Sequence, residues 1–203
     1  MKLKVCGMRE AENIEGLIEL KPDFIGFIFY PKSARFAGEL DDDLMARIPL
    51  SIKKVGVFVN EDIENVITLC KKYGLTYAQL HGDEDLDYAM ELKAKGIKVI
   101  KVFRVMDTVP VAATKYEGIA DYLLFDTATI SYGGSGQHFD WNLLNNQNIK
   151  TPFLLSGGVQ LEDLKKIKGL NLPALAGIDV NSRFEVEPGL KDLELLRALK
   201  DEL

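Results

Sequence analysis

Two side chains that can exchange protons each lie at the end of a short apolar run. Cys6 ends the run Leu3–Cys6, and Asp126 follows the run Tyr122–Phe125. A partly buried carboxyl group can have a raised pKa and act as a general acid, and a thiolate can act as a base or a nucleophile. The residue types alone leave a second interpretation open, because a lone cysteine is often a small core residue and Asp-Thr often begins a turn.

Two glycine-bearing segments near the end of the chain have the composition of a phosphate site. They are Ser156–Gly158 and Gly177–Ser182. Glycine lets backbone N–H groups approach an anion closely, and a helix N-terminus adds unpaired donors. The alternative is two ordinary strand-to-helix turns that use glycine for geometry.

Three further side chains are candidates for ligand contacts. Arg35 could hold a carboxylate through two parallel hydrogen bonds, or it could belong to a solvated basic loop. His81 follows the apolar run Tyr77–Leu80 and could position a substrate, although structural histidines are also common. His138 ends a glycine-rich stretch, residues 131–138, which we expect to form a mobile flap.

Short apolar runs that could position these residues recur along the whole chain. Their lengths and their bounding Gly, Pro and Asp residues are typical of strands. Eight such runs are present: Leu3–Cys6, Phe24–Phe29, Val55–Val59, Tyr77–Leu80, Val99–Phe103, Tyr122–Phe125, Phe153–Ser156 and Leu175–Asp179.

The segments between these runs have helical periodicity. One apolar stripe comprises Ile63, Val66, Ile67 and Cys70, and acidic residues occupy its first turn. Helix ends are also indicated: Gly96 as a C-cap, Asp140 as an N-cap before Trp141, and Asp192 at the start of the last helix.

Strands that alternate with helices predict a parallel sheet with right-handed crossovers. Eight such units in 203 residues fit a closed (β/α)8 TIM barrel that forms a single domain over residues 1–203. The rival is an open doubly wound sheet, and the chain lacks the glycine-rich dinucleotide fingerprint after its first strand. The barrel places function at the C-terminal ends of the strands, and barrels commonly hold phosphate in loops seven and eight.

Composition excludes several classes of partner. Apolar residues make up 47% of the chain and charged residues 28%, with a net charge of -6. An acidic protein of this kind is not expected to bind nucleic acid or a membrane. Two cysteines without a CxxC pair or a Cys/His cluster predict neither a disulfide framework nor a metal site. The first residues lack the apolar run of a signal peptide, so we expect a cytoplasmic location.

A set of short motifs resembles the phosphoribosylanthranilate isomerase family of tryptophan biosynthesis. The motifs occur in the family order and cover the chain from end to end. They are Lys4–Gly7, Phe27–Phe29 with Ser33 and Arg35, Gly56–Asn60, Gln79–Gly82, Asp126–Thr127, Gly133–Gly136, Phe139–Trp141, Ser156–Gly158, Asp179–Ser182, Glu185, Pro188–Gly189 and Lys191–Asp192. The chain departs from many members at Met8-Arg9, which changes the rim of the site beside Cys6.

The resemblance implies an Amadori rearrangement of N-(5-phosphoribosyl)anthranilate to 1-(2-carboxyphenylamino)-1-deoxyribulose 5-phosphate. By match to the family motifs, Asp126 is the general acid that protonates the ribose ring oxygen, and Cys6 is the base that removes the C2 proton. Arg35 holds the anthranilate carboxylate. The remaining substrate contacts are His81, Gly157, Gly158, Asp179, Asn181 and Ser182.

The implied reaction needs no metal and no organic cofactor, and its partner is a small phosphosugar substrate. The sequence does not decide between a monomer and a homodimer. It also leaves open a second, histidine-pathway aminoaldose as a substrate.

The sequence leaves two rival functions open. Another phosphosugar barrel enzyme is one, although metal-dependent epimerases use several histidines and this chain has two. An isomerase of the histidine pathway would carry aspartates after strands one and five, where this chain has Cys6 and Arg104. A non-catalytic barrel that senses a phosphorylated ligand is the other rival, and turnover distinguishes it from an enzyme.

Overall fold

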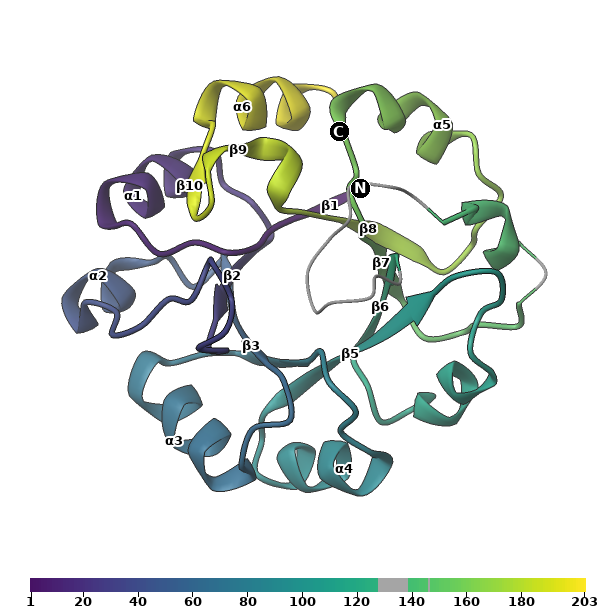
Figure 1. The fold of residues 1–203 in the computed structure, drawn as a ribbon, viewed down its shortest axis with the longest axis horizontal. Coiled ribbons are helices and arrows are strands. Elements are labelled where there is room, and N and C mark those ends of the chain that lie inside the picture. The colour runs from purple at the N-terminus through teal and green to yellow at the C-terminus, as the bar shows by residue number, and fades with distance from the viewer. Residues whose placement is uncertain (128–138, 146) are drawn as a thin grey trace.

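The computed structural model describes residues 1–127, 139–145 and 147–203, and it contains all eight predicted strands (Figure 1). The strands are β1 (Lys2–Val5), β2 (Phe24–Ile28), β3 (Lys53–Phe58), β4 (Tyr77–Leu80), β5 (Lys98–Val105), β6 (Tyr122–Thr127), β7 (Phe153–Leu155) and β8 (Leu175–Val180). The observed bounds of β4 are those predicted, and the bounds of the other strands differ from the predicted ones by at most two residues.

These strands form a closed parallel barrel in chain order, which confirms the predicted (β/α)8 architecture and excludes the open sheet. The ring closes at β1, which pairs with both β2 and β8. Lys4 shows this directly, because it lies opposite Phe24 on one side and Asp179 on the other.

Helices follow the strands around the outside of the barrel (Figure 1). The α-helices are α1 (Ala11–Glu19), α2 (Asp42–Arg47), α3 (Ile63–Tyr73), α4 (Leu86–Ala94), α5 (Leu164–Lys168) and α6 (Leu193–Asp201). Four segments of the described chain are 3-10 helices: η1 (Val111–Tyr116), η2 (Trp141–Leu144), η3 (Leu161–Asp163) and η4 (Ser182–Phe184). None of the helices in the described part of the chain is long and apolar enough to cross a bilayer.

Among the described residues, β5 and β6 are followed by the 3-10 helices η1 and η2 rather than by α-helices. The η1 segment begins after Pro110 and includes the β-branched residues Val111 and Thr114, which are weak helix formers. The loop after β8 contains only the three-residue 3-10 helix η4 among its described helical residues. A small hairpin, β9 (Glu185–Glu187) and β10 (Leu190–Lys191), follows it.

Side-chain hydrogen bonds cap several helices, and those of Asp140 and Asp192 confirm predicted helix starts. The Asp62 carboxylate accepts from two backbone N–H groups in the first turn of α3, and Asp192 caps α6 in the same manner. Asp140 accepts from the N–H of Asn142, although the helix that it caps is the 3-10 helix η2. Gly96 follows α4 with a φ of 81°, a conformation that glycine adopts without strain.

The inside of the barrel has an apolar half and a polar half, because inward-facing side chains recur every second residue along each strand. Toward the N-terminal ends, the apolar side chains form one buried cluster: Phe24, Val55, Tyr77, Ile100, Val102, Leu124 and Leu154. The ring of Phe24 meets those of Tyr77 and Tyr122 edge to face at 5.6 and 5.5 Å. Gln79 lies two residues beyond Tyr77, and Asp126 lies two residues beyond Leu124. The inward faces of β4 and β6 therefore become polar toward the C-terminal ends.

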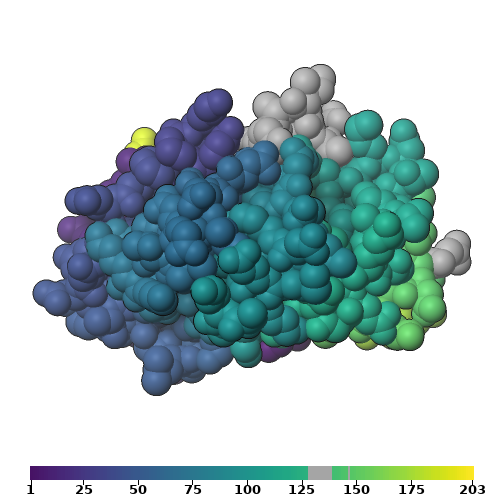
Figure 2. Space-filling view, turned by 90° about the horizontal axis from the view of Figure 1, so that it is seen from below, coloured from purple at the N-terminus to yellow at the C-terminus, as the bar shows by residue number. Residues whose placement is uncertain are grey.

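A larger apolar core lies between the strands and the surrounding helices. Val66, Ile67 and Cys70 of the predicted α3 stripe are all buried in it. In the side view, the residues of α3 and α4 (blue and teal) form part of the surface that faces the reader (Figure 2). The packed half of the barrel and this outer shell together leave the C-terminal mouth as the place for a ligand.

Candidate active site

A cavity of about 250 Å³ opens at the C-terminal ends of the strands. Its wall contains every candidate site residue that falls within the described part of the chain. These are Cys6, Arg35, His81, Asp126, Gly157, Gly158, Asp179, Asn181 and Ser182. The glycine-rich stretch that ends at His138 lies outside the described residues.

Cys6 follows β1 and is buried, with a backbone N–H that donates to the carbonyl of Val180. Gly26 makes room for it, since a Cβ at that position would lie 3.0 Å from the Cys6 sulfur. Burial raises the pKa of the Cys6 thiol above its ordinary value, while the nearby Lys4 ammonium opposes this by favouring the thiolate. The residue is therefore a thiol at neutral pH, beside a positive charge that stabilises its ionised form.

Lys4 and Asp179 form a buried ion pair inside the barrel, with Nζ 2.8 Å from Oδ1. The Ser156 hydroxyl donates to the other carboxylate oxygen at 3.4 Å. Burial alone would lower the pKa of Lys4, but the charges of Asp179 and Cys6 outweigh it and raise that pKa. Lys4 is thus a permanent cation close to Cys6.

Asp126 lies near the end of β6 and points into the cavity. Burial raises its pKa to about 7, and the negative charge of Asp179 adds to the effect. Near neutral pH a substantial fraction of Asp126 is consequently protonated, which is the state that a general acid requires.

His81 is the neighbour of Asp126, with Nε2 3.6 Å from Oδ2. Burial lowers the pKa of His81 to about 4, and the positive charges of Lys4, Arg104 and Lys101 act in the same direction. The imidazole is therefore neutral at pH 7, and the contact between His81 and Asp126 is not an ion pair at that pH.

Arg35 follows β2 and faces the cavity, but its guanidinium already holds a carboxylate of the protein. Nε lies 2.9 Å from both carboxylate oxygens of Glu185, and Nη2 lies 2.7 Å from Oε2. Lys191 also pairs with Glu185 and donates to the side-chain oxygen of Asn181 at 2.6 Å. Burial works to raise the pKa of Glu185, but Arg35 and Lys191 outweigh it and hold that pKa below its ordinary value.

The glycine turn after β7 requires glycine for two reasons. Gly157 and Gly158 have φ values of 88° and 86°, which L side chains rarely adopt. A Cβ on Gly157 would also lie 2.3 Å from the hydroxyl oxygen of Thr127. Asn181 and Ser182 follow β8 and line the same cavity. The turn therefore presents bare backbone to the cavity, as a phosphate site needs.

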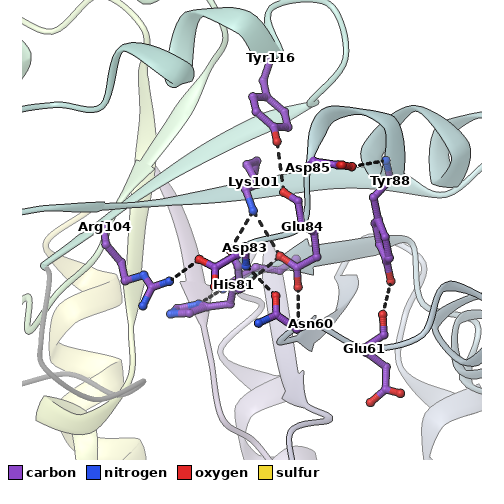
Figure 3. Close-up of polar contacts among 12 residues, drawn as sticks. Asn60, Glu61, His81, Asp83, Glu84, Asp85, Tyr88, Lys101, Arg104 and Tyr116 are labelled. Atoms are coloured by element: carbon purple, nitrogen blue, oxygen red, sulfur yellow. Dashed lines mark hydrogen bonds and ion pairs between the residues drawn. The ribbon is translucent and has the colours of Figure 1, made fainter.

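A buried polar cluster ties the ends of three strands together beside His81 (Figure 3). The Glu84 carboxylate accepts from the backbone N–H groups of Asn60 and Gly82 at 2.7 and 3.0 Å. Lys101 of β5 donates to Glu84 and to the carbonyl of Gly82. Tyr116 adds a hydrogen bond to the backbone carbonyl of Glu84. The loops after β3 and β4 are thus held against β5, which fixes the position of His81.

Replacing Lys101 with methionine is expected to lower the free energy of unfolding by about 3–5 kcal/mol, because it leaves the Glu84 carboxylate buried without its cation. Urea denaturation measures this change. The double variant Lys101→Met/Glu84→Gln should lose less than the sum of the single changes, since it removes both charges. A loss below about 1 kcal/mol in Lys101→Met would contradict a stabilising role for the pair.

Several residues in or beside the cavity were not assigned a role from the sequence. Lys4, Glu185 and Lys191 belong to the matched motifs, but their partners are distant in the chain. A signal exists for Lys4 and Gln79, since each is a polar residue at an inward position of an apolar strand. The described part of the chain holds no group of three or more His, Cys, Asp or Glu side chains arranged to bind a metal ion.

Comparison with known proteins identifies the family. The family model described as N-(5'-phosphoribosyl)anthranilate (PRA) isomerase matches residues 3–202. This chain belongs to that family. It is similar to the N-(5'-phosphoribosyl)anthranilate isomerase of Parabacteroides distasonis, with 46% identity over 97% of this chain and 90% of the relative. The isomerase of Phocaeicola vulgatus is also 46% identical, over 95% of this chain and 92% of its own.

Solved structures of phosphoribosylanthranilate isomerases have the same fold. The structure from Thermotoga maritima is 31% identical and superposes with a TM-score of 0.84 over 100% of this chain and 98% of its own. A second isomerase structure contains reduced 1-(o-carboxyphenylamino)-1-deoxyribulose 5-phosphate. It is 27% identical to this chain and superposes with a TM-score of 0.81 over 100% of this chain and 97% of its own. The chain is accordingly an enzyme of the isomerase family with a TIM-barrel fold.

Proposed function

We propose that this protein converts N-(5'-phosphoribosyl)anthranilate to 1-(2-carboxyphenylamino)-1-deoxyribulose 5-phosphate, with Asp126 as the acid and Cys6 as the base. The observation that carries the proposal is the Asp126 carboxyl group, whose pKa is raised to about 7 in the same cavity as a buried thiol beside Lys4. The bound ligand of the related isomerase supports this substrate.

The proposed reaction moves two protons. Asp126 donates a proton to the ribose ring oxygen, the ring C1–O bond breaks, and the amine lone pair forms a Schiff base at C1. Cys6, as the thiolate, then removes the proton from C2, and the C2–H electrons form the enolamine. Tautomerisation of the enolamine gives the ketone. Lys4 stabilises the thiolate that this step requires.

The two ends of the substrate are anionic, and the cavity offers a site for each. We assign the phosphate to the backbone of Gly157 and Gly158, with Asn181 and Ser182 across from them. Arg35 is assigned to the anthranilate carboxylate. Because Arg35 is paired with Glu185 in this structure, the substrate carboxylate must compete with or share that pairing.

The neutral His81 and the Lys4–Asp179 pair are proposed to complete the site between these ends. His81 orients Asp126, and Asp179 keeps both Lys4 in place and the pKa of Asp126 high. We propose that the enzyme acts in the cytoplasm as a monomer or a homodimer. The phosphoribosylanthranilate isomerase of Thermotoga maritima is dimeric, and monomers generated from it have been solved.

Turnover of the substrate by the purified protein tests the proposal. A separate transferase would generate phosphoribosylanthranilate from anthranilate and phosphoribosyl pyrophosphate, and loss of its fluorescence would be followed with and without the protein. We expect protein-dependent loss and the ketone product by NMR. Absence of turnover, with phosphate still bound, would contradict the proposal in favour of another phosphosugar protein.

A further inference from the structure

One buried polar atom in the wall of the cavity has no hydrogen-bond partner among the residues that the structure describes. Gln79 lies on β4, one inward position before His81, and is 2% exposed. Its amide nitrogen is 3.2 Å from Nδ1 of His81. Within the described residues, its amide oxygen, Oε1, makes no hydrogen bond, although the side chain lines the cavity. Buried carbonyl oxygens without donors are rare in proteins, so this one requires an explanation.

The contacts of His81 fix the orientation of the Gln79 amide. Nε2 of the imidazole faces the Asp126 carboxyl group, where an N–H is favourable. A neutral imidazole with its hydrogen on Nε2 has a lone pair on Nδ1, and that lone pair accepts from the Gln79 N–H. The amide nitrogen is thereby directed toward His81, and Oε1 is left for another donor.

The neighbours of Gln79 show that packing does not require a polar residue here. Val57 and Ile100 lie opposite it on the two adjoining strands, and both are apolar. An unbranched apolar side chain would fill the same space without burying an unpaired oxygen. The amide is consequently best explained by a ligand that supplies the missing donor.

We propose that Oε1 of Gln79 binds the substrate by accepting a hydrogen bond from a hydroxyl group of its sugar. This inference rests on the function proposed above. The phosphate and the carboxylate of that substrate cannot be the partner, because both are acceptors at neutral pH. The sugar lies between those ends, near Asp126 and Cys6, and it carries the hydroxyl donors.

Binding measurements on Gln79→Met test this assignment, since methionine has a similar length and no amide. The probes for calorimetry are reduced 1-(o-carboxyphenylamino)-1-deoxyribulose 5-phosphate, ribulose 5-phosphate and inorganic phosphate. Gln147→Met is the matched control, because Gln147 is exposed and outside the cavity. We expect both sugar phosphates to bind about tenfold more weakly to Gln79→Met, as for one lost neutral hydrogen bond. Phosphate affinity and Tm should equal those of wild type.

Three results would overturn the assignment. Equal affinity of Gln79→Met and wild type for both sugar phosphates would mean that Oε1 contacts no hydroxyl. A loss confined to the anthranilate-bearing ligand would identify its amine N–H as the partner instead. A parallel loss of phosphate affinity and Tm would indicate a structural role.

The same measurements separate this inference from the proposed function. Wild-type turnover combined with equal affinities in Gln79→Met would overturn only the role of Gln79. Absence of wild-type turnover, combined with weaker ribulose 5-phosphate binding in Gln79→Met, would overturn the isomerase reaction and support Gln79 as a sugar contact. If wild type bound neither sugar phosphate, both proposals would be overturned.

Discussion

Replacing Asp126 with asparagine is expected to lower kcat by about 10²–10⁴-fold, the usual contribution of a positioned general acid. Asparagine has nearly the same shape, so the fold and the contact with His81 should persist. It cannot deliver an acidic proton to the ring oxygen, and ring opening should become rate-limiting. Removing a buried carboxyl group next to Asp179 also relieves repulsion, so the free energy of unfolding should not fall.

Steady-state fluorescence kinetics measure this loss, and Asp62→Asn is the matched control. Asp62 caps α3 on the outer surface, and asparagine caps helices about as well as aspartate. The control should therefore keep the wild-type rate. If Asp126→Asn retained a kcat within about threefold of wild type, far short of the general-acid contribution, another group would have to supply the proton.

Replacing Cys6 with serine is expected to reduce kcat by a similar factor, about 10²–10⁴-fold, because a hydroxyl is a far weaker acid than a thiol and does not supply the base. The substrate should still bind, since the proposed contacts of phosphate and carboxylate are made by other residues. The kinetics should show a large fall in kcat with a small change in KM.

Cys70→Ala is the control for this change. Cys70 is the other cysteine of the chain, it is buried on α3 away from the cavity, and burial raises its pKa to about 12. Its replacement can lower stability but should leave kcat unchanged. A substrate deuterated at C2 adds a second readout, because removal of the C2 proton should become slower in Cys6→Ser than in the wild-type enzyme. A Cys6→Ser variant with wild-type kcat would contradict the assignment of the base.

The sequence predicted the barrel well, because the evidence for it is local. Each strand is a short apolar run, and caps such as Asp140 and Asp192 mark helix starts. The predictions were less accurate after β5 and β6, where the helical residues that the structure describes form 3-10 helices rather than α-helices. There the choice depends on the packing of short crossovers, which periodicity does not record.

The site was predictable only as a set of strand ends. The C-terminal ends of the parallel strands meet at one mouth of the barrel, so Cys6, His81 and Asp126 were expected to lie together. The structure brings these three residues into one cavity. Their electrostatics could not be read from the sequence, because the raised pKa of Asp126 depends on burial and on Asp179 of another strand. The pairing of Arg35 with Glu185 joins residues far apart in the chain, so it could not be predicted from the sequence either.

The pH dependence of kcat/KM tests the acid–base pair most directly. This ratio reports the protonation of the free enzyme. The active form holds a proton on Asp126 and none on Cys6, so it carries one proton in total. Because the pKa of Asp126 is about 7 and that of Cys6 lies above 9.0, one-proton molecules accumulate between those values. Among the one-proton molecules, the fraction that holds the proton on Asp126 and has Cys6 as the thiolate is small and does not change with pH. The value of kcat/KM is therefore proportional to the population of one-proton enzyme.

The decisive measurement is kcat/KM from about pH 5 to pH 10 for wild type and Asp126→Asn. For wild type, we expect kcat/KM to rise as the pH increases through about 7 and to fall at alkaline pH as Cys6 ionises. In Asp126→Asn the limb near pH 7 should disappear, and the residual rate should rise only at alkaline pH. A wild-type profile that is flat through pH 7, or a limb there that persists unchanged in Asp126→Asn, would contradict the assignment of Asp126 as the acid.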